Sequence, residues 1–248
     1  MIMKVFILCG GLGTRLRSVV KDTPKPMAPV LGRPFLSYLM DSFSVGSVTE
    51  FILCVGYKRE QIIDHFGKCY KDISISYSIE EEPLLTGGAL QKAFLSLKSS
   101  EREEPVLVIN GDTFVKFNLP KMLERFNETQ ADLVMLTKKL ESPDRYGTVI
   151  LDKDERILGF KEKTKKTNSG LINAGVYLFK PNLLINFRET PFSFERDFLE
   201  PNVGKIKVVS FETFADFIDI GVPSDYARCK DMLLSLIHIS EPTRRRGI

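Results

Sequence analysis

Two short segments near the amino end combine residue types that bind phosphate. An apolar run at residues 5–9 leads into GGLGTRL at 10–16, and PKPM follows at 24–27. Glycine has no Cβ, so its backbone N–H groups can approach a ligand closely. Arg15 and Lys25 add the positive charge that a triphosphate requires. Together these features predict a phosphate-binding loop at the end of a buried strand.

The spacing of the glycines argues against two more common phosphate-binding loops. A P-loop has the pattern G-x-x-x-x-G-K-[ST], which this chain lacks. A dinucleotide-binding loop has the pattern G-x-G-x-x-G, and Leu16 stands where its third glycine belongs. A nicotinamide-dependent oxidoreductase is therefore disfavoured.

Two aspartates follow or end predicted strands, where they could hold a hard cation. Asp112 comes after the apolar run 106–109 in an Asn-Gly-Asp turn, and Asp219 lies near the end of the segment 214–220. Mg²⁺ prefers carboxylate oxygens, although aspartate is also a common turn former. His65 is the only credible histidine for catalysis, which argues against a Ser-His-Asp site.

The composition is that of an ordinary globular protein and does not indicate a nucleic-acid or membrane partner. Of the 248 residues, 43% are hydrophobic and 27% are charged, as in ordinary globular domains, and the net charge of +3 is too small to suggest a nucleic-acid or membrane surface. No apolar run reaches the roughly 18 residues of a membrane helix, and no signal peptide is recognisable. Cys9 and Cys54 lie in apolar runs and are expected to be reduced core residues, so we expect a cytoplasmic location. The composition does not indicate an oligomeric state.

The last fifteen residues differ in character from the rest of the chain. Residues 234–248, beginning LSLIHISEPTR, look like a translated sequencing-library adapter. We therefore expect one domain over residues 1–233, with a nucleotide-binding half at about 1–130 and a sugar-binding half at about 131–233. The alternative for residues 234–248 is a genuine basic tail.

Strand and helix patterns alternate through the first half of the chain. Strands are predicted at 4–9, 51–55, 73–79, 106–109 and 132–137, with helical stripes of apolar residues between them. The second half has more strands, at 146–151, 156–163, 171–179, 206–209 and 214–220, before a final helix from about 223. This order predicts an α/β fold with a mostly parallel sheet between helices, and such sheets bind ligands at the carboxyl ends of their strands.

The segments at 10–16 and 24–27 resemble the signature of the sugar-1-phosphate nucleotidyltransferases, and the resemblance covers about residues 3–232. These enzymes join a nucleoside triphosphate to a sugar 1-phosphate and release pyrophosphate. The resemblance implies a Rossmann-like fold, with a mostly parallel mixed sheet in a three-layer αβα arrangement, and Mg²⁺ as the cofactor. A phosphate monoester has a second pKa of about 6, so the attacking oxygen is already anionic and needs no general base.

The resemblance also implies roles for individual residues. Arg15, Lys25 and Asp112 would be catalytic, and Asp112 and Asp219 would hold the metal. The segment 82–89 resembles the base-recognition turn of the family, where Leu85 replaces a glycine. We expect backbone N–H groups at the helix start after this turn to be available to the nucleotide. The residues implied for nucleotide binding are Leu8, Gly10, Gly11, Gly13, Thr14, Arg15, Glu82, Thr86, Gly87, Gly88 and Gly111.

The sugar phosphate would be bound by residues of the second half. These are Tyr146, Gly147, Glu162, Lys163 and Asn173. In the family, the counterparts of Glu162 and Lys163 contact sugar hydroxyls and the sugar phosphate. The alternative is a solvated charge run, because further lysines surround the pair.

Within the family, the sequences KPMAP at 25–29 and NGDTF at 110–114 are most similar to guanylyltransferases that act on D-glycero-D-manno-heptose 1-phosphate. This similarity implies GTP as donor and a GDP-heptose for surface polysaccharide as product. Mannose 1-phosphate with GTP, or glucose 1-phosphate with dTTP or UTP, remain alternatives. A non-catalytic regulatory subunit would be favoured by loss of Lys25, Asp112 or Asp219, and all three are present.

Overall fold

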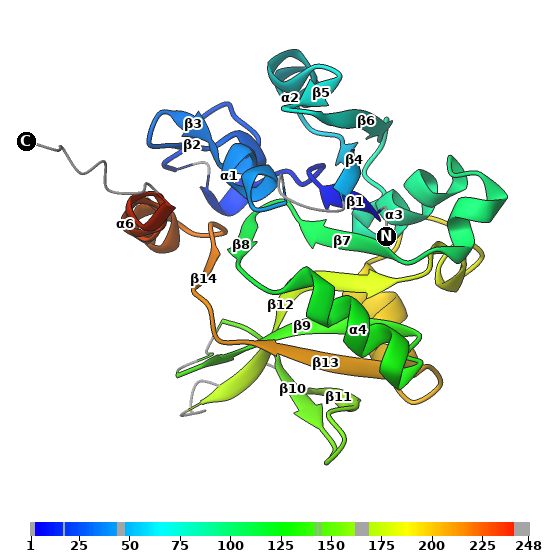
Figure 1. Ribbon diagram of the computed structural model, residues 1–248. Helices are drawn as coiled ribbons and strands as arrows, with labels where there is room; N and C mark the ends of the chain where they lie inside the picture. The colour runs from blue at the N-terminus through cyan, green and yellow to red at the C-terminus, as the bar shows by residue number, and fades with distance from the viewer. Residues whose placement is uncertain are drawn as a thin grey trace, which may run out of the picture.

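The computed structural model describes residues 3–16, 18–43, 48–141, 143, 145–161 and 169–240. Its centre is a 10-stranded mixed sheet in the order β11-β10-β12-β7-β1-β4-β6-β5, with β9 paired to β12 and β13 paired to β9 (Figure 1). The strands are β1 (Met3–Leu8), β4 (Val48–Val55), β5 (Cys69–Tyr70), β6 (Ile73–Ile79), β7 (Val106–Asn110), β9 (Leu133–Leu140), β10 (Thr148–Leu151), β11 (Ile157–Lys161), β12 (Gly170–Phe179) and β13 (Val208–Thr213).

Smaller elements complete the fold. Two further sheets have two strands each: β2 (Pro29–Val30) with β3 (Arg33–Pro34), and β8 (Thr113–Val115) with β14 (Phe217–Asp219). The α-helices are α1 (Phe35–Asp41), α2 (Arg59–Phe66), α3 (Leu85–Leu95), α4 (Leu119–Thr129), α5 (Glu200–Asn202) and α6 (Pro223–Ser240). Short 3₁₀ turns are η1 (Thr14–Leu16), η2 (Lys25–Met27), η3 (Ser99–Glu103) and η4 (Pro181–Leu183), and η5 (Phe194–Leu199) is a π-helical turn.

The strand directions divide the sheet into two parts. β1 runs parallel to β4 and β7, and β4 runs parallel to β6. β12 is antiparallel to β7, β9 and β10, while β13 is parallel to β9. The predicted mixed sheet with a parallel centre is therefore confirmed. Its antiparallel pairs lie on either side of this centre, with β5 against β6 at one edge and the pairs of β12 with β7, β9 and β10 on the other side.

Helices pack on both faces of the sheet, against apolar side chains that point alternately to one face and to the other. On β1, Val5 and Ile7 pack in one cluster with α1, α2 and α4, whereas Phe6 packs in a second cluster with α3. A strand buried on both faces presents successive side chains to opposite layers. The three-layer expectation is confirmed (Figure 1).

A third apolar cluster holds α6 against the β2–β3 hairpin. It includes Phe35 of α1, Ile218 of β14, and Tyr226 and Leu233 of α6. Figure 1 shows β14 leading from the main sheet to this helix. The strand predicted at 214–220 is shorter than expected, because only Phe217–Asp219 pairs with β8. The helix predicted from about residue 223 begins at Pro223 and continues to Ser240.

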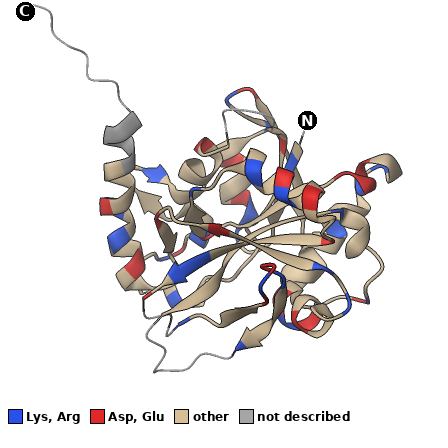
Figure 2. Cartoon of the chain, turned by 60° about the horizontal axis from the view of Figure 1, so that its bottom comes forward, with Lys and Arg blue, Asp and Glu red and all other residues tan. Residues whose placement is uncertain are grey.

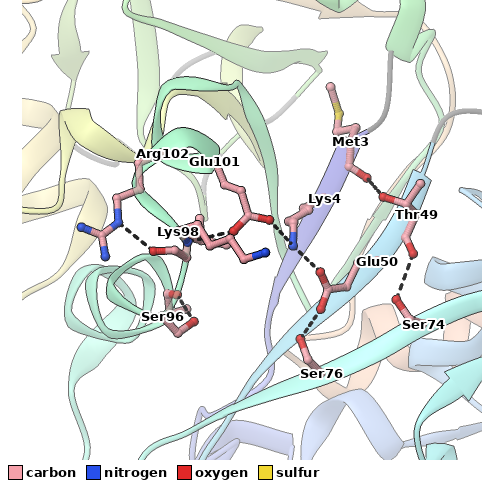
Figure 3. Close-up of polar contacts among 12 residues, drawn as sticks. Met3, Lys4, Thr49, Glu50, Ser74, Ser76, Ser96, Lys98, Glu101 and Arg102 are labelled. Carbon is pink, nitrogen blue, oxygen red and sulfur yellow. Dashed lines mark hydrogen bonds and ion pairs between the residues drawn. The ribbon is translucent and has the colours of Figure 1, made fainter.

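Ion pairs fasten the amino ends of the parallel strands, away from the phosphate loop. Lys4 Nζ donates to Glu50 Oε2 at 2.5 Å and lies 3.0 Å from Glu101 Oε1 (Figure 3). Glu50 Oε1 accepts a hydrogen bond from Ser76 Oγ at 2.8 Å, which links β1, β4 and β6. These partly buried contacts link three neighbouring strands through their side chains.

The described residues agree with the compositional expectations. Cys9 and Cys54 are buried free thiols, as predicted for core residues. Acidic and basic side chains are interspersed along the elements seen in Figure 2 rather than separated by sign. Within the described part of the chain, no helix has the length and hydropathy needed to span a membrane.

Candidate active site

The glycines of the phosphate loop let three segments close around the end of β1. A Cβ on Gly10 would collide with Oε1 of Glu80, and a Cβ on Gly13 would lie 2.9 Å from Cγ of Lys25. Gly111 N donates to Leu8 O at 3.0 Å, which draws the end of β7 against the same loop. The predicted loop therefore lies at the carboxyl ends of parallel strands, as expected for a ligand site in such a sheet.

Lys25 and Asp112 form an ion pair at this edge. Lys25 Nζ donates to Asp112 Oδ2 at 2.9 Å, and the exposed fractions of the two side chains are 14% and 31%. Prolines at 24 and 26 flank Lys25 and restrict its backbone on η2. The structure therefore brings together two of the three predicted catalytic residues in a partly buried, charge-assisted contact.

Asp219, from the carboxyl-terminal part of the chain, lies near the Lys25–Asp112 ion pair. Its strand β14 pairs with β8 in a register that sets Asp219 opposite Thr113, and Ile220 N donates to Asp112 O at 3.0 Å. Burial and the nearby charge of Asp112 raise the pKa of Asp219, although the hydrogen bond from Gly221 N at 2.7 Å opposes this shift. A bound cation would relieve the repulsion between these two carboxylates.

The donor set fits Mg²⁺. Among the described residues, no three or more His, Cys, Asp or Glu side chains are grouped so that they could hold a metal ion. The site therefore has two protein ligands for a cation, the interacting carboxylates of Asp112 and Asp219. Mg²⁺ is commonly held by one or two carboxylates and keeps its remaining positions for water and substrate phosphates.

Arg15 lies on η1 and is exposed. Within the described ranges, it forms no ion pair with a carboxylate. Its guanidinium is therefore not committed to an acidic partner there, which leaves it available for an anionic ligand. The structure does not join Arg15 to Lys25 or Asp112 by a direct contact.

A cavity of about 670 Å³ adjoins Asp219 and contains the predicted Tyr146. Tyr146 Oη donates to Asp219 Oδ2 at 3.4 Å, and burial together with the charge of Asp219 raises the pKa of this phenol. The guanidinium of Arg145 lies 5.5 Å from the Tyr146 ring and pairs with Asp225 at the start of α6. Gly147 follows directly, and a Cβ at this position would lie 3.2 Å from Lys161 O. Arg145 was not predicted. Its position directly before the predicted residues Tyr146 and Gly147 could have identified it as a candidate for the same site.

The turn before α3 differs from the sequence expectation in its backbone. Gly87 N and Gly88 N donate to Phe192 O at 2.9 and 3.2 Å. The expectation that N–H groups at this helix start are available is therefore wrong for these two, because the 192 carbonyl already accepts from them. Leu85 has a φ of +61° and is 48% exposed, so its side chain points outward from a left-handed backbone position.

Glu195, which was not predicted, links the turn predicted to recognise the base to a residue predicted to bind the sugar. Thr86 Oγ1 donates to Glu195 Oε2 at 2.9 Å, and Tyr177 Oη donates to Oε1 at 3.2 Å. Asn173 Nδ2 in turn donates to Tyr177 Oη at 2.6 Å. One carboxylate on η5 thus holds predicted residues of both substrate regions. Sequence periodicity carries no signal for this contact because η5 is an irregular π-helical turn.

Glu80 is a second acidic residue that sequence reasoning missed. It directly follows β6, is 9% exposed, and accepts a hydrogen bond from Leu84 N at 3.2 Å through Oε2. Within the described part of the chain, Oε1 has no hydrogen-bond donor, and it faces Gly10 of the phosphate loop. Burial raises the pKa of this carboxyl, while the Leu84 N–H opposes the shift.

Five predicted residues remain to be placed, and the structure describes three of them. Gly11 and Thr14 belong to the loop and its η1 turn, and Glu82 is exposed just before the turn that starts α3. Glu162 and Lys163 lie outside the described residues.

The chain is similar to known proteins over nearly its whole length. The sequence profile of the family described as "Nucleotidyl transferase" matches residues 4–235. The chain is 45% identical over 232 residues to the D-glycero-alpha-D-manno-heptose 1-phosphate guanylyltransferase of Aneurinibacillus thermoaerophilus, covering 93% of this chain and 98% of that protein. It is 42% identical over 225 residues to the protein of the same name from Campylobacter jejuni, covering 90% of this chain and 97% of that protein.

A solved structure gives the same result for the fold. HddC from Yersinia pseudotuberculosis, complexed with GMP-PN, superposes with a TM-score of 0.81 at 36% identity, covering 94% of this chain and all of that chain. The Rossmann-like nucleotidyltransferase fold is confirmed. As its phosphate loop and neighbouring aspartates indicated, the chain belongs to the nucleotidyl transferase family.

Proposed function

We propose that this enzyme joins GTP to D-glycero-α-D-manno-heptose 1-phosphate, giving a GDP-heptose and pyrophosphate for surface polysaccharide. The proposal is supported by 45% and 42% identity to two relatives of that name over nearly their whole lengths. The free thiols of buried Cys9 and Cys54 fit a reducing compartment, so the proposal includes a cytoplasmic location.

The observation that carries the choice of GTP is the carboxylate of Glu80. The Watson–Crick edge of guanine presents two neighbouring donors, N1–H and the N2 amino group, and an ionised carboxylate is an acceptor only. Uracil and thymine present one N–H between two carbonyl oxygens, which would repel a carboxylate. Because Glu80 is buried beside Gly10 with Oε1 free of a donor in the described chain, it supports recognition of guanine next to the phosphate loop.

The chemical step requires charge control rather than acid–base catalysis. A phosphate oxygen of the sugar phosphate forms a bond to the α-phosphorus of GTP, and the bond to the pyrophosphate oxygen breaks. Lys25 lies at the carboxyl edge of the sheet, where it would orient phosphate oxygens, and exposed Arg15 would contact the departing β- and γ-phosphates. In this proposal Gly10, Gly11, Gly13 and Thr14 supply backbone contacts.

Asp112 and Asp219 would hold Mg²⁺, which supplies charge neutralisation to the phosphates when bound. Tyr146 would help to orient Asp219 through their hydrogen bond, and the adjoining cavity would receive the sugar phosphate. Lys25, Arg15 and the cation that the carboxylates would hold together would give the two anionic substrates compensating positive charge and a fixed geometry.

Donor selectivity tests this proposal. Pyrophosphate release is measured with D-glycero-α-D-manno-heptose 1-phosphate as acceptor and GTP or UTP as donor. Wild-type protein should prefer GTP, and Glu80→Gln should lower kcat/KM for GTP about 10–100-fold, because a charged hydrogen bond contributes about 1.5–3 kcal/mol. The glutamine amide, with one donor and one acceptor, should reduce the discrimination against UTP.

Glu81→Gln is the matched control. Its carboxylate is exposed and pairs with Arg59, so this substitution should leave donor selectivity unchanged. Equal effects of Glu80→Gln on GTP and UTP would contradict recognition of guanine by Glu80. A wild-type preference for UTP would contradict the proposed donor itself.

A further inference from the structure

The side chain of Asn110 lies at the end of β7 and contains a buried oxygen, Oδ1. Its Oδ1 is excluded from solvent and has no hydrogen-bond partner among the described residues. Buried polar groups in folded proteins are almost always paired, and an unpaired one weakens the fold. An orphaned amide next to a candidate active site therefore suggests a partner that arrives with a ligand.

Gly175 determines where this amide sits. It has a φ of +70°, and a Cβ at this position would lie 2.7 Å from Asn110 Nδ2. The pairing of β12 with β9 shifts register between Asn173 and Tyr177, so Gly175 lies within an irregularity of β12. Bulged strands often re-aim side chains next to active sites. The absence of a side chain at Gly175 thus leaves room for the Asn110 amide beside β12.

A nearby amide on β12 shows the contrast. Asn173 Nδ2 donates to Tyr177 Oη at 2.6 Å, and Asn173 Oδ1 accepts from Gly175 N at 2.9 Å. The Asn173 side chain is therefore fixed by internal bonds, whereas Asn110 forms none within the described ranges. Of these two amides, Asn110 has more hydrogen-bonding capacity left for a ligand.

We propose that Asn110 recognises a hydroxyl of the sugar, in addition to the residues predicted from the sequence. It directly precedes Gly111 and Asp112 of the candidate active site, and its amide lies beside Gly175 of β12. An amide donates and accepts, as a sugar hydroxyl does, so one hydroxyl can satisfy either end of the group. This inference rests on the proposed function, because it assigns a contact within the same sugar site.

Asn110→Leu tests the proposal because leucine has a similar shape and no polar atoms. The KM for D-glycero-α-D-manno-heptose 1-phosphate should rise about 3–10-fold, as expected for the loss of a neutral hydrogen bond, while the KM for GTP stays near that of wild type. The urea midpoint of the ligand-free variant should equal or exceed that of wild type, because the substitution removes an unpaired buried atom.

Gln91→Met is the matched control, since Gln91 Nε2 donates to Leu184 O and Ile185 O. This variant should lose stability and keep the sugar KM of wild type. A lower urea midpoint for Asn110→Leu, or an unchanged sugar KM, would overturn the proposal. Failure of wild-type protein to turn over this sugar would instead refute the proposed function, and the urea midpoint would still report on Asn110.

Discussion

Lys25 Nζ lies 2.9 Å from Asp112 Oδ2, although 87 residues separate the two in the chain. The contact joins the η2 turn to the residue just after the parallel strand β7. Asp219, which approaches from β14, adds a second carboxylate to this place. Lys25 therefore compensates the charge of these carboxylates, and in the proposed function it would also place a positive charge beside the substrate phosphates.

Removal of the Lys25 ammonium should reduce turnover strongly. Lys25→Ala is expected to lower kcat at least 100-fold, since a positioned donor at developing charge is typically worth that much. The measurement is pyrophosphate release at saturating GTP and sugar phosphate, with circular dichroism to check the fold. Lys21→Ala removes an exposed lysine nearby and should leave the rate unchanged. A folded Lys25→Ala protein with the wild-type rate would exclude Lys25 from the mechanism.

The raised pKa of Asp219 makes its ionisation costly to the fold. The folded protein binds this proton more tightly than the unfolded chain, so the stabilising contribution is full below about pH 3.8 and is lost as pH rises through the raised pKa. Asp219→Asn cannot ionise. It should be more stable than wild type at pH 7.5 without divalent cations, and this advantage should shrink as pH falls.

Urea unfolding at pH 7.5 and pH 5 in the presence of a chelator measures this difference. Asp216→Asn, at an exposed carboxylate three residues earlier, is the control and should have little effect at either pH. An Asp219→Asn variant that is less stable than wild type at pH 7.5 would show that the negative charge stabilises the fold.

Leu85 occupies a left-handed backbone position that favours glycine. A non-glycine residue there destabilises the fold by about 1–2 kcal/mol. Replacing it with glycine removes this strain, but the greater flexibility of glycine in the unfolded chain offsets about 0.5–1 kcal/mol of the gain. Leu85→Gly should therefore stabilise the protein by up to about 1 kcal/mol in urea unfolding. Leu85→Ala keeps the Cβ and should give no such gain. Equal stabilisation by both variants would point to the exposed apolar side chain rather than to the backbone.

The helix α6 contains the boundary proposed for the adapter-like tail. Leu233 is 1% exposed within its apolar cluster, while Leu234 is 39% exposed. Truncation after Leu233 should change the free energy of unfolding by no more than about 0.5 kcal/mol and preserve activity. Truncation after Arg228 also removes buried Cys229 and Leu233, and should cost at least about 2 kcal/mol. Equal losses for both truncations would place residues 234–248 within the stable fold.

The sequence predicted those features that depend on local pattern. The strand at 73–79 and the phosphate loop after β1 follow from apolar alternation and from glycines at a strand end. The resemblance also paired Asp112 with Asp219, which the β8–β14 register brings close.

The features missed by sequence analysis depend on tertiary contacts. Glu80 matters because β6 ends beside Gly10, and Glu195 matters because η5 packs between α3 and β12. The N–H groups of Gly87 and Gly88 were assigned to a ligand because their partner, Phe192 O, lies about a hundred residues away in the chain. No local pattern reports such a pairing.

Turnover by wild-type protein tests the central claim most directly. Pyrophosphate release with Mg²⁺ is measured for GTP, dTTP, UTP, CTP and ATP, each with heptose, mannose and glucose 1-phosphates, and products are identified by mass. The account predicts the highest kcat/KM for GTP with D-glycero-α-D-manno-heptose 1-phosphate, and a GDP-heptose product. A higher value for another pair, or no release by folded protein that binds GTP, would contradict it.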